Sequence, residues 1–308
     1  MRKTIKGIRN FLIYFFLRFI FILANLLPLK IAYGLANLLS ILSYHVFPSD
    51  RNTAMSNLKT AFPDKDPKQL DLIYRKSLIN MGLCAIDVLR FKSLGKNGIL
   101  NIVEVEGMDD FDRAYQRGKG IAAVTGHISN FELIAAWFGQ AGYKASAVGR
   151  RIYDQRLNKL LIDNRKATNV KNIDSEEPAN VFMRTLREGY AIGVLIDQDS
   201  RRYRGEFIDF FGKSAYTPIG PILLARTVKA AVVPLIILRK PDGNYFLKVF
   251  PEIKFDYSAE RMNDVKKVLA DATKVLEQVI RENPEQWVWM HKRWNTRPED
   301  IKVESEAV

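Results

Sequence analysis

The sequence predicts an α/β fold: a mixed, largely parallel β-sheet flanked by helices, preceded by an apolar helical segment that acts as a membrane anchor. Two observations lead to this prediction. From residue 101 onward, short and nearly continuous apolar runs alternate with helix-like stretches, as expected for a sheet covered on both faces. Before that point, residues 1–49 hold six basic residues and no acidic residue, and they are strongly apolar.

The composition of this 308-residue chain excludes several classes of protein. Hydrophobic residues make up 47% of it, which excludes a disordered chain. The counts of 18 Gly and 12 Pro are ordinary, which excludes a collagen-like or low-complexity chain. Cys84 is the only cysteine, so the chain is no disulfide scaffold, and its helical surroundings favour packing in the core. The length suits one large domain or two small ones.

The amino-terminal segment allows three interpretations. From Asn10 to Leu29, 16 of 20 residues are apolar. A secretory signal peptide is disfavoured because the apolar stretch continues to about Phe47. A spanning helix has the necessary length, but Arg18 would then lie near the middle of the membrane. We favour an interfacial anchor or a helical hairpin, bent at Pro28, that lies in one leaflet.

This interpretation divides the chain into an anchoring segment, residues 1–47, and a main domain, residues 48–308, of which 48–100 form a helical lead-in. The basic amino terminus is expected to stay on the cytoplasmic side of the membrane. A hairpin or surface anchor then leaves the main domain on the cytoplasmic face as well. The lone cysteine agrees with a reducing compartment.

The expected elements of the main domain follow from hydrophobic spacing and turn residues. Strands are expected at Ile102–Val105, Gly120–Thr125, Ala145–Val148, Tyr190–Ile196, Ala231–Leu238 and Tyr245–Phe250. Helices are expected at Gln69–Phe91, Asp109–Arg117, Glu132–Gln140, Gln155–Lys166, Ala179–Glu188, Pro218–Lys229 (with Pro218 in its first turn) and Ala259–Glu282.

His127 is the strongest candidate for a catalytic base. It follows the buried run Gly120–Thr125 and precedes a helix, so it lies at the carboxyl end of a strand, where α/β proteins form their sites. Glu132 comes five residues later and can accept a hydrogen bond from one ring nitrogen while the other takes a proton. An alternative stays open: Ser129 and Glu132 also match a capping box, which has no catalytic role.

Further candidates also follow strands. Arg150 and Arg151 come directly after Ala145–Val148, where an arginine can bind a phosphate or an oxyanion. Asp197 ends another strand and precedes an arginine cluster that is either a solvated loop or a surface for an anionic lipid or protein: Arg201, Arg202 and Arg204. The carboxyl-terminal stretch 286–297, which includes His291, combines aromatic and basic residues and suits a membrane interface or plain packing.

Other chemistries lack their motifs. The sequence contains no nucleophile elbow, no phosphate-binding or dinucleotide-binding glycine loop, and no Cys/His cluster with zinc spacing.

Six pieces, in order along nearly the whole chain, resemble the bacterial late acyltransferases of lipid A synthesis within the lysophospholipid-acyltransferase superfamily. They are the basic apolar amino terminus, Thr125–Glu132 (TGHISNFE), Val148–Arg151 (VGRR), Ile196–Asp199 (IDQD), Asp209–Gly212 leading to Thr217-Pro218, and Pro284–Trp294 (PEQWVWMHKRW). The superfamily often has Asp five residues after the histidine. Glu132 at that position is usual in the lipid A branch.

The resemblance implies an acyltransferase domain that moves a fatty acyl chain from acyl carrier protein to a hydroxyl of a lipid A precursor at the bacterial inner membrane. His127 would be the general base and Glu132 would orient it. Arg150, with Arg151 and Asn130 as further candidates, would bind the acceptor phosphate or the oxyanion. Asp197 would have a structural or acceptor-binding role. The resemblance implies no metal, no cofactor and no acyl-enzyme.

Two alternatives remain beside this interpretation. The same chemistry can act on another acceptor, such as a glycolipid, a phosphatidylinositol mannoside or an amino lipid. A non-catalytic module that binds lipid or the carrier protein is the other, and the paired His127 and Glu132 disfavour it. The net charge of +13 suits the acidic carrier protein, an anionic lipid and the membrane. No nucleic-acid motif accompanies it, so no nucleic-acid partner is expected.

Overall fold

The computed structural model describes residues 2–152 and 154–301, without the side chains of residues 2–10, 12 and 13. Most of the basic residues of the predicted anchor therefore have side chains outside the described part: Arg2, Lys3, Lys6 and Arg9.

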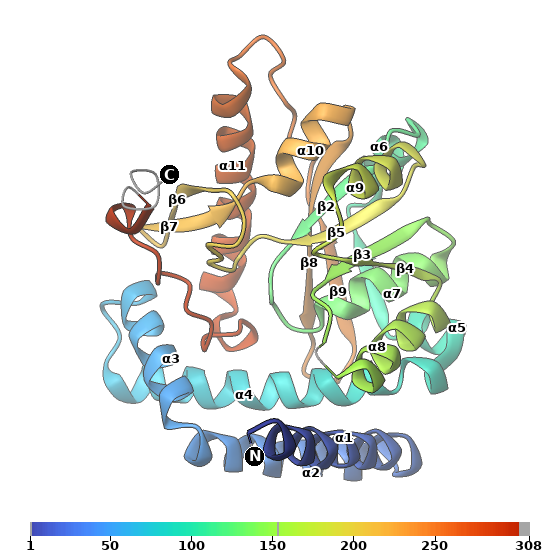
Figure 1. The fold of residues 1–308 in the computed structure, drawn as a ribbon, viewed down its shortest axis with the longest axis vertical. Helices are drawn as coiled ribbons and strands as arrows, with labels where there is room; N and C mark the ends of the chain where they lie inside the picture. Colours follow the sequence, from blue (N-terminus) through green and yellow to red (C-terminus); the bar gives the residue numbers. More distant parts are fainter. Residues whose placement is uncertain (1, 153, 302–308) are drawn as a thin grey trace.

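A seven-stranded sheet forms the centre of the molecule (Figure 1). Its strand order is β1-β9-β8-β2-β5-β3-β4, and every neighbouring pair is parallel except β8 and β9. The strands are β1 (Val103–Glu106), β2 (Ile121–Thr125), β3 (Ala145–Gly149), β4 (Val170–Asp174), β5 (Ala191–Leu195), β8 (Ala231–Arg239) and β9 (Tyr245–Val249). A separate antiparallel hairpin consists of β6 (Gly205–Phe210) and β7 (Lys213–Pro218).

Eleven α-helices surround the sheet within the described residues. They are α1 (Arg2–Leu26), α2 (Leu29–Val46), α3 (Pro48–Ala61), α4 (Pro67–Leu89), α5 (Phe91–Asn101), α6 (Met108–Gln116), α7 (Phe131–Ala141), α8 (Gln155–Ala167), α9 (Ala179–Arg187), α10 (Gly220–Val228) and α11 (Arg261–Glu282).

Alternate residues of the central strands build two cores, one on each face of the sheet, because successive side chains of a strand point in opposite directions. Ala122 and Val124 of β2 pack in the core that also contains residues of α3, α10 and α11. Ile121 and Ala123 pack in the core that contains residues of α5, α6 and α7. The near-continuous apolar runs of the sequence are therefore strands buried on both faces, as predicted.

The predicted α/β class with a mixed, largely parallel sheet is confirmed, and some details differ. The sequence prediction omitted β4, whose polar sequence VKNID occupies the edge of the sheet, and the β6–β7 hairpin. Pro218 was expected in the first turn of a helix, but it ends β7. The proline in the first turn of α10 is Pro221.

The amino-terminal helices α1 and α2 lie side by side along α4, on the outside of the molecule (Figure 1). They turn back on one another at Leu27-Pro28, close to the bend predicted at Pro28. The predicted anchor finds no support as a spanning segment, since no single helix in the described part of the chain is long and apolar enough to cross a membrane. The pair α2 and α3 passes that test together, with a bend of 89° between them.

Candidate active site

The site forms where β2 and β5 end. These strands are parallel neighbours, with Thr125 opposite Leu195, and the amide of Ile196 donates to the carbonyl of Thr125 at 3.1 Å. The residues that follow the two strands are therefore also neighbours. His127 and Asp197, 70 residues apart in sequence, meet at this edge of the sheet.

Asp197 accepts three hydrogen bonds. His127 Nδ1 lies 2.7 Å from Oδ1, the backbone amide of His127 donates to Oδ2 at 2.6 Å, and Trp287 Nε1 donates to Oδ2 at 2.8 Å. The side chain of Asp197 has no exposed surface. Burial alone would raise the pKa of Asp197, but the charge of His127 and these hydrogen bonds outweigh burial and hold the pKa well below its usual value.

Gly126 permits this close approach. A Cβ at position 126 would lie 2.9 Å from Oδ2 of Asp197 and 2.8 Å from a methyl group of Leu276. A side chain there would push the carboxylate away from the backbone amide of His127. The small residue between β2 and His127 is therefore a requirement of the site.

The carboxyl-terminal segment closes the other side of the loop that carries His127. The amide of Ser129 donates to the carbonyl of Gln286 at 2.7 Å, and the amide of Val288 donates to the carbonyl of His127 at 3.2 Å. Ser129 itself has a φ of 48°, which turns the chain toward α7. These bonds hold the indole of Trp287 against Asp197.

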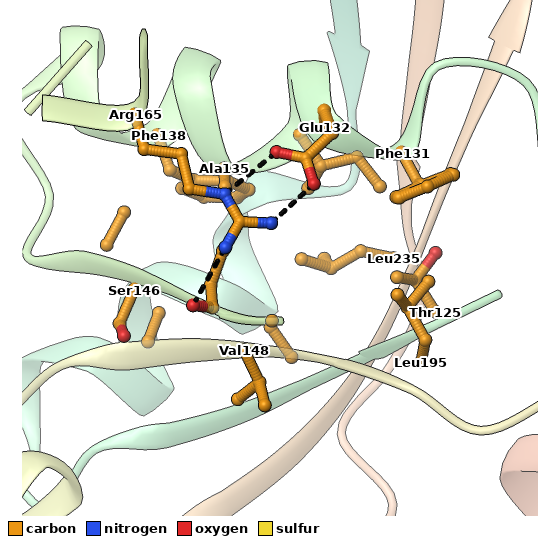
Figure 2. Close-up of a pocket in the computed structure, with 16 residues that line it drawn as sticks. Thr125, Phe131, Glu132, Ala135, Phe138, Ser146, Val148, Arg165, Leu195 and Leu235 are labelled. Carbon is orange, nitrogen blue, oxygen red and sulfur yellow. Dashed lines mark hydrogen bonds and ion pairs between the residues drawn. The ribbon is translucent and has the colours of Figure 1, made fainter. Parts of the chain in front are cut away.

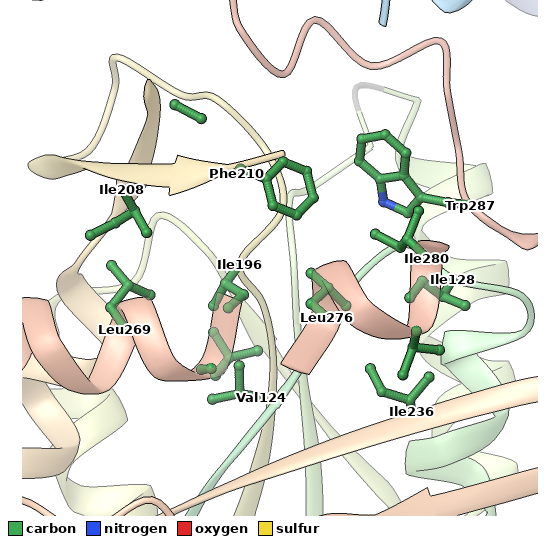
Figure 3. Close-up of a cluster of buried hydrophobic side chains, with 14 of the residues drawn as sticks. Val124, Ile128, Ile196, Ile208, Phe210, Ile236, Leu269, Leu276, Ile280 and Trp287 are labelled. Atoms are coloured by element: carbon green, nitrogen blue, oxygen red, sulfur yellow. The ribbon is translucent and has the colours of Figure 1, made fainter. Parts of the chain in front are cut away.

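Trp287 is completely buried, and its ring packs 5.7 Å from that of Phe210 in the β6–β7 hairpin. Figure 3 shows Trp287 beside Ile280, with Leu276 and Ile128 in the same apolar cluster. The predicted role of the carboxyl-terminal aromatic residues as a membrane interface therefore does not hold for Trp287 and Trp289, because both are fully buried. Plain packing, the alternative interpretation, describes them.

Glu132 does not orient His127 in this structure. Its carboxylate forms an ion pair with Arg165 of α8, at 2.5 Å from the guanidinium Nη2 and 3.1 Å from Nε. Nδ1 of His127 is instead bound to Asp197. The capping-box alternative also fails, because the N-cap of α7 is Asn130, whose side chain accepts from the amide of Leu133.

The other predicted site residues are dispersed. Asn130 is buried beneath the loop and donates to the hydroxyl of Tyr245 at 3.3 Å, so its side chain has structural partners. Arg150 is exposed after β3. Arg151 is also exposed and lies 3.4 Å from the carboxylate of Asp174. A shallow cavity of about 150 Å³ is lined by both arginines together with Asp174 and Glu177.

The second ring nitrogen of His127 faces two residues that the sequence prediction did not place in the site. Gln198 Nε2 lies 3.2 Å from Nε2 of His127, and the ring of His291 stands edge to face with that of His127, with centroids 4.7 Å apart. Phe131 packs on the histidine at 5.0 Å. Burial, together with the charge of His127, lowers the pKa of His291 to about 4.

A narrow apolar cavity of about 40 Å³ lies next to the site, between α7 and the sheet (Figure 2). Small residues of β2, β3 and β5 create it, including Ala123, Ala145 and Gly193. Thr125 and Phe131 line it near His127, Phe138 lines it farther along α7, and the Glu132–Arg165 pair borders it.

Sequence reasoning did not assign four residues of this arrangement to the site: Arg165, Gln198, Trp287 and His291. Gln198 stands next to a predicted residue in the IDQD motif, which was the available signal. Nothing in a single sequence pairs Arg165 with Glu132 across 33 positions. Within the described residues, no group of three or more His, Cys, Asp or Glu side chains is arranged to hold a metal ion.

The sequence matches a known family over nearly its whole length. The family model described as bacterial lipid A biosynthesis acyltransferase matches residues 2–296. The chain belongs to this family. The resemblance inferred from six sequence motifs is thereby confirmed.

Individual relatives agree with the family. The lipid A biosynthesis lauroyltransferase of Escherichia coli is 26% identical over 282 residues, which cover 89% of each chain. The lipid A biosynthesis palmitoleoyltransferase of Escherichia coli is 24% identical over 247 residues, 80% of this chain and 78% of that protein. A phosphatidylinositol mannoside acyltransferase of Mycobacterium tuberculosis is 25% identical over 194 residues, 62% of this chain and 59% of that protein. This member of the family is thus an acyltransferase that acts on a lipid acceptor.

Proposed function

We propose that this acyltransferase transfers a fatty acyl chain from the thioester of acyl carrier protein to a hydroxyl of a lipid A precursor, with His127 as general base. The observation that carries the proposal is the bond between His127 Nδ1 and the buried Asp197, which leaves Nε2 free to take a proton. The earlier assignment of Glu132 as the orienting carboxylate is replaced by Asp197. Glu132 instead holds Arg165 at the border of the cavity.

The transfer then takes two steps, addition of the hydroxyl oxygen to the thioester and expulsion of the thiolate. His127 Nε2 takes the proton of the acceptor hydroxyl while the oxygen attacks the thioester carbon, and the carbonyl electrons move to the oxygen. When the carbonyl re-forms, the carbon–sulfur bond breaks and the departing thiolate takes the proton from His127. Asp197 stabilises the imidazolium that exists between the two steps.

The apolar cavity beside Phe131 is the proposed seat of the acyl chain. Phe131, which packs against the ring of His127, lines this cavity, and Ala135 and Phe138 line it farther along α7. An acyl chain placed there would therefore have its thioester on the side of the base. At about 40 Å³ the cavity must widen to hold a fatty acyl chain. The residue at its far end, Phe138, is the candidate limit on chain length.

The positive net charge of the chain is consistent with two anionic substrates. The net charge of +13 favours both an acidic carrier protein and a phosphorylated lipid. Arg150 is exposed on the loop after β3 and is the candidate for the acceptor phosphate. Arg151 is the weaker candidate because it already lies near Asp174.

We further propose that the α1–α2 pair lies on the cytoplasmic face of the bacterial inner membrane. Large apolar side chains of this pair are exposed, among them Phe16 at 56%, Leu26 at 76% and Leu38 at 61%. So many exposed large apolar side chains on two neighbouring helices indicate a surface that has an apolar partner. An interfacial anchor requires no spanning helix and places the lipid acceptor at the same surface as the enzyme.

A second candidate function is the same transfer to another glycolipid. The match to a phosphatidylinositol mannoside acyltransferase, at 25% identity, keeps this acceptor open. The proposed base and the acyl cavity serve either acceptor equally, so an acceptor assay must separate the two.

The test is an in vitro transfer assay with the full chain in detergent. The protein receives acyl carrier proteins loaded with C10 to C16 chains and, separately, a tetra-acylated lipid A precursor with and without its inner-core sugar, or a phosphatidylinositol mannoside. Products are read by mass spectrometry. Lys254→Ala is the control, since this exposed residue follows Ile253, which pairs with Val232 near the amino end of β8, opposite the end where His127 lies.

We expect one added acyl mass on the lipid A precursor, lost in His127→Ala and kept in Lys254→Ala. Transfer only to the mannoside would replace the acceptor and leave the mechanism in place. Wild-type activity retained in folded His127→Ala would contradict the proposal.

A further inference from the structure

The side-chain amide of Gln198 lies close to three ring nitrogens, one of His127 and two of His291. Gln198 Nε2 lies 3.2 Å from Nε2 of His127, and 3.3 and 3.4 Å from Nδ1 and Nε2 of His291. Because Asp197 occupies Nδ1 of His127, Nε2 is the nitrogen that can accept a proton. The amide of Gln198 therefore sits where the proton of a reacting hydroxyl must arrive.

The side chain of Gln198 occupies the position beside Nε2 of His127 but does not block access to it. Its side chain is exposed, so a substrate can displace it. Its N–H groups are donors, as the acceptor hydroxyl is. The reacting oxygen is thus expected within hydrogen-bond reach of His291 as well as of His127, since the same Gln198 atom contacts both rings.

The backbone of His291 is held firmly. Asn57 of α3, itself buried, donates to the carbonyls of His291 at 2.6 Å and of Trp289 at 2.8 Å. The amide of Arg293 donates to the same carbonyl of His291 at 2.8 Å. Arg293 is buried too and donates to the carbonyl of Tyr216. These bonds fix the backbone from which the ring of His291 extends toward His127.

His291 is neutral near pH 7. Its burial, followed by the nearby charge of His127, lowers its pKa to about 4, and Asp197 only partly opposes this. A neutral imidazole carries one N–H donor and one acceptor nitrogen. It can therefore donate a hydrogen bond beside His127 without competing for the proton that His127 takes.

Once the acceptor oxygen is bonded to the thioester carbon, the carbonyl oxygen is on the same carbon and is therefore expected near the same two rings. We propose that His291 is a second catalytic residue, whose ring N–H donates a hydrogen bond to that carbonyl oxygen as it becomes an oxyanion. The inference rests on the proposed acyl transfer. The acceptor oxygen forms its bond to the carbonyl carbon, the carbonyl electron pair moves to the oxygen, and His291 stabilises that charge. When the carbonyl re-forms, the carbon–sulfur bond breaks and the thiolate takes the proton from His127.

Two kinds of substitution test this role. His291→Leu and His291→Phe remove the donor, and His291→Phe keeps an aromatic ring for the packing against His127. His291→Gln keeps an N–H donor. Asn295→Ala, at an exposed position of the same segment, is the matched control. Transfer rates are measured against both substrates in detergent, with circular dichroism and thermal melting of every variant.

We expect His291→Phe and His291→Leu to lower kcat by about 10²- to 10³-fold with KM values within about twofold of the wild type. His291→Gln should recover at least tenfold of that loss, and Asn295→Ala should stay within twofold. An equal loss in the Gln and Phe variants, or a change in KM alone, would overturn the inference.

Failure of this inference is distinguishable from failure of the proposed function. If the wild type is active, His127→Ala is inactive and His291→Phe keeps its activity, only the role of His291 is contradicted. A wild-type enzyme that transfers no acyl chain to any tested acceptor contradicts the proposed function itself.

Discussion

Two carboxylates flank the start of α7 and have different partners. Asp197 has no exposed surface and binds the imidazole of His127, a group whose charge changes with its proton. Glu132 is 20% exposed and binds Arg165, whose guanidinium keeps its charge at every relevant pH. Only the first pair can take part in moving a proton.

Spacing in the sequence paired His127 with Glu132, whereas in the structure the ring of His127 contacts Asp197 and Glu132 pairs with Arg165. Glu132 is near in sequence and points toward α8, whereas Asp197 is 70 residues away and lies in contact. The Asp197 pair is expected to control the reaction rate. The Glu132 pair is expected to control stability and the shape of the cavity.

The largest effect is expected from Asp197→Asn. Two N–H donors face Oδ2, so the amide oxygen of Asn must turn toward them and its NH₂ toward Nδ1 of His127. His127 is then forced into the tautomer with the proton on Nε2, which cannot act as a base. We expect kcat to fall by on the order of 10³- to 10⁴-fold.

Glu132→Gln is the matched comparison for Asp197→Asn. It weakens a pair that positions α7 and the cavity, so we expect a loss of at most about 10²-fold in kcat. Initial rates at saturating donor and acceptor measure both variants. A larger loss in Glu132→Gln than in Asp197→Asn would reverse the comparison.

A loss of stability is expected next, at the Glu132 end. Glu132→Leu leaves the guanidinium of Arg165, whose side chain is only 6% exposed, without its carboxylate. We expect the free energy of unfolding to fall by about 3–5 kcal/mol. The double variant Glu132→Leu/Arg165→Met should recover at least half of that loss in chemical denaturation. Additive losses would show that the two side chains do not act as a pair.

A pH-dependent stability is expected at the Asp197 end. The pKa of His291 is about 4 in the folded chain and about 6.5 in the unfolded chain. As the pH falls, the unfolded chain therefore binds a proton at this histidine before the folded chain does. The free energy of unfolding should therefore decrease by up to about 3 kcal/mol as the pH falls through this window. The depressed pKa of Asp197 removes stability only at still lower pH.

Chemical denaturation at pH 7 and at pH 4.5 measures this effect. His291→Gln should flatten the decrease, because glutamine has no proton to gain. An equal decrease in the wild type and in His291→Gln would assign the pH dependence to other groups.

The smallest effect is expected from Trp287→Phe, which removes one of three donors to Asp197 and keeps an aromatic ring in the core. Hydrogen bonds to charged groups contribute about 1.5–3 kcal/mol, so a loss of about tenfold in kcat is expected at the lower end. Trp289→Phe is the control, since its Nε1 donates to the carbonyl of Pro284. Similar losses of kcat in both variants would mean that core packing, and not the bond to Asp197, is responsible.

Much of the fold was predictable because strands buried on both faces have nearly continuous apolar sequences. The runs at Gly120–Thr125 and Tyr190–Ile196 became β2 and β5. The polar edge strand β4 gave no such signal, because an edge position does not demand apolar residues on both faces. The order of strands, which places β2 next to β5, depends on the whole topology and not on any local pattern.

The position of a candidate residue was predictable only where it follows from the local sequence. His127 could be identified because it follows a buried strand and precedes a helix. Asp197 was also a candidate, but its contact with His127 was not predictable. Asp197, Gln198 and Trp287 reach His127 through strand pairing and through the packing of the carboxyl-terminal segment. Single-sequence spacing carries no information on those contacts.

The ring contact with Asp197, and not the nearby Glu132, is expected to fix the tautomer of His127. Nitrogen-15 NMR of protein labelled in its three histidines tests it most directly, with the His127 signals assigned from the His127→Ala spectrum. We expect a proton on Nδ1 of His127 in the wild type and in Glu132→Gln, and on Nε2 in Asp197→Asn. An unchanged tautomer in Asp197→Asn, with a switch in Glu132→Gln, would contradict it.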